Sequence, residues 1–335
     1  MTTRPKGLLS NSLDISPRTA AFVAVELLKR AMPYLCLEKF GQAKPLPGNK
    51  TTSMKFRRYN SLPLATTALV EGVTPVGKKM TATDVTCTLA QYGDFVEISD
   101  VVQDTHEDPV LQEAGNVISE QAAKTVETIR YNTLKACSNV FYGNSVAART
   151  SVVTAISRAD QRKIVRALER QNAQHITSVV KSTPNFNTES VLPAFVGITH
   201  VDMTSDIRGM TGFISVADYG KFTPYETEIG SCEDVRYIKS TIFAPYPDGG
   251  GTKGAMLSTS GTLADVYPVI FVGKDAYGLV ALKGKYAITP MVLNPGVPRG
   301  GDQLGQRGSV AWKTMQTVVI LNDAWMAIGE WAATN

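Results

Sequence analysis

Residues 66–100 alternate polar and apolar side chains as a β-strand does, but the segment is too rich in Thr, Lys and Gly to bury either face well. Residues 50–59 alternate in the same way, and a Pro- and Gly-rich segment separates them from a second alternation at 80–98. The pattern predicts one long two-stranded hairpin with residues 71–79 near its tip. An isolated two-stranded ribbon is marginally stable in water, because ordering its backbone costs more than so little burial returns. The ribbon is therefore expected to need a second surface that covers it.

The strongest helix signal covers residues 109–140, where Asp108 can cap the N-terminus and Pro109 can take the first helical position. Apolar side chains recur at spacings of three and four along one face, and Gly143 supplies a stop signal. A helix of this length spans about 45 Å, whereas the usual helix has about 11 or 12 residues. The segment is therefore expected to form a rigid amphipathic spine.

Other segments predict shorter elements. Residues 17–40 carry a helical pattern that Pro33 would bend or end. A helix is also predicted over residues 157–176, with Ser157 as its capping residue. Strands are predicted at 193–201, 234–243, 266–273, 278–284 and 312–330, with a turn of helix at 205–210.

Composition excludes several classes of protein. The chain has 335 residues, of which 43% are hydrophobic and 19% charged, so it is expected to fold compactly. Its formal net charge of +4 is small for this length, and a dedicated nucleic-acid reader is disfavoured. The four cysteines are far apart in the sequence, as suits reduced thiols in a cytoplasmic setting. No apolar run approaches the about 18 residues of a membrane span, and the N-terminal residues lack the apolar core of a secretory signal, so no membrane partner is expected.

Motifs that would carry chemistry are weak. Gly249, Gly251 and Gly254 fit the spacing of a dinucleotide-binding loop, but no strand precedes them and no helix follows. His200 and Asp202 could point the same way at a strand end, but two side chains do not complete a metal site. We therefore expect no catalytic residue, no cofactor and no metal.

Basic residues gather in two places. The sequence KFRRY at 55–59 mixes charged side chains with aromatic rings, as proteins that bind single-stranded nucleic acids do. Strand alternation sends Arg57 and Arg58 to opposite faces, however, which favours contacts to acidic groups of a neighbouring chain. The predicted helix at 157–176 carries a basic face, interpreted as solvated or as facing an acidic neighbour.

Longer stretches of the chain resemble one family of proteins. They read FRRYNSLPLATTALVEGVTP, QYGDFVEISDVVQDTHEDPVL, GFISVADYG, EIGSCEDVRYIKST and DQLGQRGSVAWKT, in this order, and the resemblance covers residues 51–330. These stretches, and the order of the predicted elements, resemble the major capsid proteins of tailed bacteriophages, which share the Hong Kong 97 fold. The resemblance implies an α+β fold with an N-terminal arm, an extended two-stranded loop, a long spine helix, and peripheral and axial domains.

The same resemblance implies a division of the chain. It makes residues 1–49 the N-terminal arm, 50–100 the extended loop, 101–145 the spine helix of the peripheral domain, 146–309 the axial domain with crossings to the peripheral domain, and 310–335 a C-terminal return. We expect the chain to begin directly with the arm, without the long helical segment that serves some relatives as a built-in scaffold.

The resemblance implies a structural function rather than an enzymatic one. Many copies would form hexamers and pentamers of an icosahedral shell, assembled in the host cytoplasm, that encloses double-stranded DNA by non-specific contact. Scaffolding, portal and decoration proteins are further partners that it implies. Two alternatives are a nanocompartment shell of the same fold and a soluble α/β enzyme with a dimerisation arm. The residues expected at contacts between copies are Lys55, Arg57, Arg58, Tyr59, Glu71, Lys78, Lys79, Glu97, Asp100 and Asp104.

Overall fold

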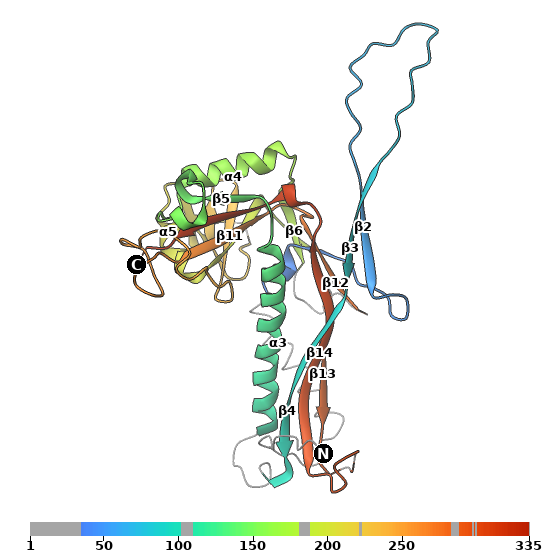
Figure 1. Ribbon diagram of the computed structural model, residues 1–335, viewed down its shortest axis with the longest axis vertical. Helices are drawn as coiled ribbons and strands as arrows, with labels where there is room; N and C mark the ends of the chain where they lie inside the picture. Colours follow the sequence, from blue (N-terminus) through green and yellow to red (C-terminus); the bar gives the residue numbers. More distant parts are fainter. Residues whose placement is uncertain are drawn as a thin grey trace.

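The computed structural model describes residues 35–101, 110–180, 188–220, 223–282, 288–296, 298 and 300–334. One long helix runs along the molecule, two β-sheets lie beside it, and a hairpin projects from one end (Figure 1). Residues 17–34 of the predicted N-terminal helix lie outside the described residues. Of the rest of that helix, only η2 (Leu37–Lys39) is helical, as a single 3-10 turn.

The helix predicted as a spine is α3 (Val110–Leu134). Its apolar face buries Ile118 and Ala122 against Val310 and Trp312 of the five-stranded sheet. The helix ends before residue 140, its predicted end, because the chain turns after Leu134 and residues 140–142 pair with a strand of the other sheet. The spine is therefore confirmed, but it is shorter than the periodicity of the sequence suggests.

The five-stranded sheet is built around the long strand β14 (Arg307–Ile320). β4 (Ala90–Ser99) and β13 (Ile288–Leu293) both pair antiparallel with β14, as does β12 (Tyr277–Ala281) near the C-terminal end of β14. The two-residue strand β1 (Gln42–Ala43) completes the sheet in parallel with β12. α3 covers one face of this sheet, and the other face stays open.

The projecting hairpin is formed by β2 (Ser53–Tyr59) and β3 (Ala82–Thr88), which pair antiparallel over their whole lengths. The predicted second strand at 80–98 is wrong as a single strand, because it divides at Leu89. Leu89 is buried, and its backbone N–H donates to the carbonyl oxygen of Thr52 at the base of the hairpin. The residues after it turn away from β2 and join β14 as β4, so the hairpin is shorter than predicted.

The eight-stranded sheet carries the second core. Its strands include β7 (Thr188–His200) and β10 (Val235–Ser240), which are parallel neighbours in the middle of the sheet. α4 (Arg158–Arg170) packs on it through Ile164 and Leu168, and the Ser157 side chain caps this helix as predicted by accepting from the N–H of Asp160. The other elements of this part of the chain are β5 (Val140–Tyr142), β6 (Ile176–Val180), α5 (Thr204–Arg208), β8 (Phe213–Ser215), β9 (Glu228–Cys232), β11 (Val266–Val272) and β15 (Met326–Ala332), with the 3-10 turns η3 (Gly143–Ser145), η4 (Arg149–Ser151), η5 (Val201–Met203), η6 (Val216–Asp218) and η7 (Asp323–Trp325).

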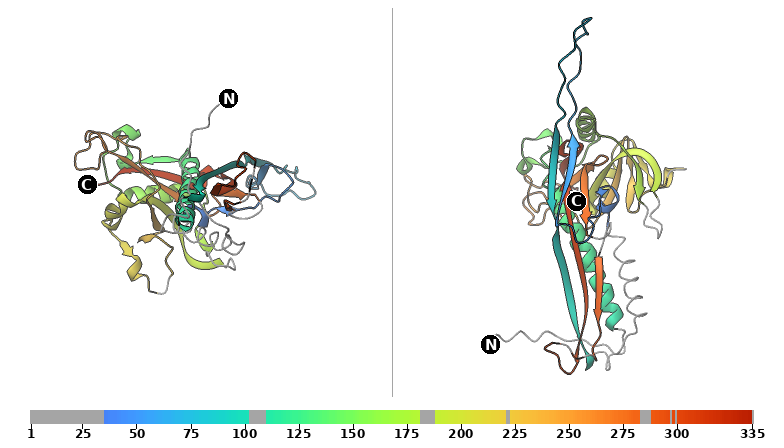
Figure 2. Two further views of the ribbon diagram at one scale, coloured as in Figure 1. Left: turned by 90° about the horizontal axis from the view of Figure 1, so that it is seen from below. Right: turned by 90° about the vertical axis from the view of Figure 1, so that its right-hand side faces the viewer.

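The chain crosses between the two sheets more than once. β12 and β13 belong to the five-stranded sheet, although they fall within the predicted axial segment 146–309. The strand predicted at 312–330 is two strands, and η7 separates β14 in one sheet from β15 in the other. Seen along the axis of α3, the eight-stranded sheet lies on one side of the helix and the hairpin on the other (Figure 2). None of the helices in the described residues combines the length and apolarity of a membrane span.

Candidate assembly interface

The base of the hairpin is anchored to its own chain by one face. Phe56 is buried there with Leu46 and with Val280 of the neighbouring sheet strand β12, and the ammonium of Lys44 lies 5.7 Å from the centre of the Phe56 ring. Gly278 leaves room for this ring, because a Cβ at that position would lie 2.9 Å from Phe56 Cζ. The hairpin therefore leaves the sheet in a fixed direction.

The opposite face of the hairpin is exposed and carries a cross-strand ion pair. Arg57 and Asp84 are direct partners in the β2–β3 register. Arg57 Nε donates to Asp84 Oδ1 at 2.7 Å, and Nη2 donates to Oδ2 at 2.9 Å. This hydrogen bonding lowers the pKa of the Asp84 carboxyl from its usual value. The guanidinium fork of Arg57, expected to contact a neighbouring chain, thus already holds an acid of its own chain.

Beyond the paired strands, residues 60–81 form a long loop without regular structure. We call this segment the apolar loop. The backbone N–H of Asn60 donates a hydrogen bond of 2.9 Å to the carbonyl oxygen of Thr81 at the base of the loop. Lys78 Nζ donates to the carbonyl oxygen of Pro63 at 3.0 Å across the loop. Its large apolar side chains are exposed, up to 94% for Val76. They are Leu62, Leu64, Leu69, Val70, Val73, Val76 and Met80.

A second exposed apolar surface lies on the five-stranded sheet. We call it the open face, and it is the face opposite α3. Phe95 and Met291 flank Ala311 in one row of the β4–β14–β13 register, and Leu293 lies in the next row. Phe95 is 58% exposed, and Met291 and Leu293 are also exposed. Contiguous exposed apolar side chains are typical of interaction surfaces.

The residues expected at contacts fall into two groups. Lys55, Arg57, Arg58 and Tyr59 lie together on β2, and Glu71, Lys78 and Lys79 lie in the apolar loop. Glu97 lies near the far end of β4 and Asp100 directly follows the strand, at the opposite end of the molecule from the loop (Figure 1). Asp104 lies outside the described residues. The residues expected at contacts did not include the apolar side chains of either surface. Residues 62–76 carried a signal for the loop, because their Leu and Val residues follow neither a helical nor a strand period.

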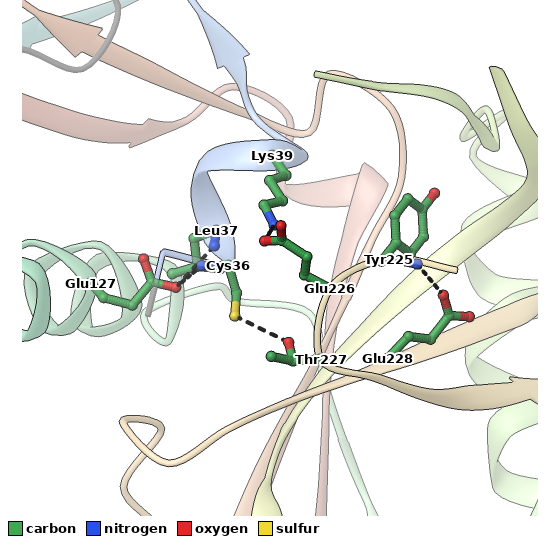
Figure 3. Close-up of polar contacts among 8 residues, drawn as sticks. All are labelled: Cys36, Leu37, Lys39, Glu127, Tyr225, Glu226, Thr227 and Glu228. Carbon is green, nitrogen blue, oxygen red and sulfur yellow. Dashed lines mark hydrogen bonds and ion pairs between the residues drawn. The ribbon is translucent and has the colours of Figure 1, made fainter. Parts of the chain in front are cut away.

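A compact turn fastens the chain before the hairpin to α3. We call residues 36–40, which contain η2, the clasp. The side chain of Glu127, fully buried on α3, accepts the backbone N–H groups of Cys36 and Leu37 through Oε1, both at 2.9 Å (Figure 3). Arg130, one turn further along α3, donates to Glu38 at 3.0 Å and to Gln316 of β14 at 2.9 Å. The clasp is thus held by hydrogen bonds to the interior of the molecule.

The clasp also contacts the eight-stranded sheet through the loop at 225–228. Lys39 forms an ion pair with Glu226, and the thiol of Cys36 lies 3.7 Å from the hydroxyl of Thr227 (Figure 3). The ring of Phe40 packs edge-on against Tyr225. Burial raises the pKa of the Cys36 thiol to about 12, so this thiol is neutral in the closed clasp.

A buried ion pair holds that loop in place. Arg236 donates to both oxygens of Glu228, at 2.8 and 2.7 Å, and both side chains are almost fully buried. The backbone N–H of Tyr225 donates to the same carboxylate at 2.7 Å, and the Tyr225 ring stacks on the guanidinium of Arg236. The clasp therefore rests on a rigid part of the second sheet.

The weak motifs have structural explanations. Gly250, within the glycine-rich loop, lies against backbone: a Cβ there would overlap the carbonyl oxygen of Val152. His200 Nδ1 lies 3.0 Å from Asp202 Oδ2, and Tyr267 donates to the same oxygen at 2.8 Å, so these side chains contact one another. Within the described residues, no three or more His, Cys, Asp or Glu side chains are placed to hold a metal.

This combination of elements defines the class of fold. A long helix on a small sheet, a second larger sheet and a projecting hairpin make up the Hong Kong 97-type capsid fold, and the α+β prediction is confirmed. Among solved structures, the chain is similar to the capsid of Ralstonia phage GP4, with a TM-score of 0.64, 10% identity, and 88% of this chain and 87% of that chain covered.

Two further solved structures share the fold. The cyanophage Pam1 capsid has a TM-score of 0.61 and 12% identity, with 100% of this chain and 97% of that chain covered. The head of Helicobacter pylori bacteriophage KHP40 has a TM-score of 0.59 and 10% identity, with 87% of this chain and 86% of that chain covered. A scan of protein-family models found no match, and a search of curated protein sequences found none. At such low identities the likeness concerns the fold.

Proposed function

We propose that this chain is the major capsid protein of a tailed phage, a structural subunit that assembles into the icosahedral head around double-stranded DNA. The observation that carries the proposal is the apolar loop, whose large side chains are exposed in the single chain. The fold of the chain is similar to that of phage capsids. An exposed apolar surface of this extent calls for a partner.

The partner that best fits the apolar loop is a second copy of the chain. The open face of the five-stranded sheet presents Phe95, Met291 and Leu293, and it lies away from the loop of the same chain (Figure 1). A loop from one copy on the open face of the next gives a contact between two different surfaces. Such heterologous contacts close into rings when the rotation between copies allows it, as in hexamers and pentamers.

Each such contact is modest in energy, and the shell sums many of them. Burying one Leu or Val side chain contributes about 1.5–3 kcal/mol. Ordering the backbone costs about 1–2 kcal/mol for each residue of the apolar loop that becomes fixed. Because every copy both donates a loop and accepts one, the contacts reinforce one another once a ring has formed.

The charged residues would adjust the contact rather than drive it. Lys55 and Arg58 on β2, with Lys79 in the loop, are the positive groups of the contact. Glu97 of β4 and Asp100, which follows β4, are the negative ones. Exposed ion pairs contribute about 0–1 kcal/mol each. The net charge of +4 suits a container that holds DNA by non-specific contact. Assembly in the host cytoplasm, and contacts to scaffolding, portal and decoration proteins, belong to this proposal.

Electron microscopy and sedimentation velocity on the full-length protein test the proposal. Purified from overexpressing cells, alone or with the genes encoded beside it, the protein is expected to form closed shells or rings of five and six copies. Replacing residues 62–79 by a short turn should abolish them and leave a folded monomer, because β2 and β3 keep their register. Monomers under all coexpression conditions would contradict a capsid function. Shells that enclose a protein and never DNA would indicate a nanocompartment instead.

A further inference from the structure

The buried carboxylate of Glu127 has an unusual set of partners. Oε1 accepts two backbone N–H groups from the clasp, at 2.9 Å each. Oε2 is also buried, and none of the described residues forms a hydrogen bond with it. A buried carboxylate is costly when ionised unless its charge is paired.

Two carboxylates, Glu127 and Glu38, lie near Arg130, and Lys39 acts on Glu38 as well. Arg130 donates to Glu38 of the clasp, and its second nitrogen is used by Gln316, so its contribution to Glu127 is through the field alone. Glu38 and the Cys36 thiol face Glu127 from the clasp, Arg130 faces it from α3, and uncharged Gln316 belongs to β14. Lys39 and Glu226 lie around Cys36. With both carboxylates ionised, the buried cluster would carry an excess negative charge.

We propose that Glu127 couples proton uptake to closure of the clasp, so that residues 36–40 are held tightly between α3 and the eight-stranded sheet when Glu127 is protonated, and are released more readily when it is ionised. The device is built from the turn, the helix and Arg130, which acts on both carboxylates. It is independent of the proposal that the chain forms a shell.

The direction follows from the two environments of Glu127. In the closed clasp, burial raises the pKa of Glu127 from 4.5 to about 7, against the opposing effects of Arg130 and the two N–H groups. In the open clasp the carboxylate meets water and regains its ordinary pKa. Closure is therefore strongest below about pH 4.5 and weakens as pH rises through about 7. Between pH 5.5 and 8.5 the opening equilibrium constant should rise about thirtyfold.

Hydrogen exchange measured by mass spectrometry on the full-length protein tests this. Exchange of the backbone amides of residues 36–40, corrected for the intrinsic pH dependence of exchange, gives the opening constant. The wild-type constant is expected to rise with pH by one to two orders of magnitude. Glu127→Gln keeps the acceptor oxygen and removes the Glu127 titration, so its constant should rise with pH far less than that of the wild type. The remaining rise comes from Glu38, whose pKa burial also raises. The matched control is Glu113→Gln, an exposed acid in the first turn of α3, which should behave as the wild type.

A second variant keeps the test decisive if Glu127→Gln folds poorly. Glu38→Gln removes the competing carboxylate, so Glu127 gains the full field of Arg130 and the rise should move to lower pH. A wild-type opening constant that does not change between pH 5.5 and 8.5 would overturn the proposal. So would a rise of wild-type size in Glu127→Gln, or one that Glu38→Gln abolishes while Glu127→Gln does not.

Discussion

At the scale of single residues, two buried carboxylates near the clasp are stabilised in different ways. Glu228 is paired with Arg236 through two short hydrogen bonds and also accepts the N–H of Tyr225. Glu127 accepts two N–H groups, but no guanidinium of the described residues is bonded to it. The first arrangement fixes the loop at 225–228, and the second leaves a carboxylate that responds to pH. The clasp therefore joins a rigid support to a titratable one.

The ion pair of Arg236 gives a prediction for stability. Arg236→Ala removes the only guanidinium bonded to Glu228 among the described residues and leaves a fully buried charge. Removing one partner of a buried pair costs about 3–5 kcal/mol. Urea denaturation of the full-length protein should show this loss in the free energy of unfolding. Arg57→Ala, which breaks an exposed ion pair on the hairpin, serves as the control and should leave the midpoint nearly unchanged. Equal losses in both variants would contradict this account of Glu228.

At the scale of elements, α3 is stabilised by packing on the five-stranded sheet. Its sequence has few strong apolar residues, yet Ile118, Ala122 and Val126 are fully buried. Gln121 extends the contact at the edge of the helix, where it donates to Asp94 of β4 at 2.6 Å and accepts from the indole of Trp312 at 3.3 Å. The helix and the sheet thus stabilise each other, and neither is expected to persist alone.

Adjacent residues of α3 offer a matched comparison. Ile118 is buried against the sheet, whereas Val117 is 61% exposed. Ile118→Ala should lower the free energy of unfolding by about 2–5 kcal/mol, because it leaves a cavity beside Trp312. Val117→Ala should change it by less than about 0.5 kcal/mol. Thermal and urea unfolding of both variants measure the difference. Similar losses would show that the face of α3 is assigned wrongly.

Elements with a local signal could be predicted from the sequence, and elements defined by distant partners could not. The period of the apolar residues was enough for α3, and Ser157 marked the start of α4. Alternation through Leu89 could not show that β3 pairs with β2 while β4 pairs with β14, because both pairings use the same period of two. The clasp could not be predicted either, because its partner Glu127 is 91 positions away from Cys36 in the sequence.

At the scale of the whole molecule, the two apolar surfaces are separated so that a single chain cannot satisfy both. The apolar loop extends from one end of the molecule, and the open face lies beside α3 (Figures 1 and 2). The base of the hairpin is fixed by Phe56, so bending the loop back onto the same sheet would require that anchor to break. In the proposed assembly, a second copy of the chain would bury the loop.

A double-mutant cycle tests whether these two surfaces meet between copies. Val76→Ser in the loop and Phe95→Ser on the open face should each raise the critical concentration for assembly, measured by sedimentation, without lowering the thermal stability of the monomer. If the surfaces contact each other, the combined variant should lose less than the sum of the two, with a coupling of about 0.5–3 kcal/mol. Leu304→Ser removes another strongly exposed apolar side chain, outside both surfaces, and should have no effect. Strict additivity would place the loop on a different surface of the neighbouring copy. Assembly unchanged in both single variants would mean that the exposed apolar side chains do not hold the copies together.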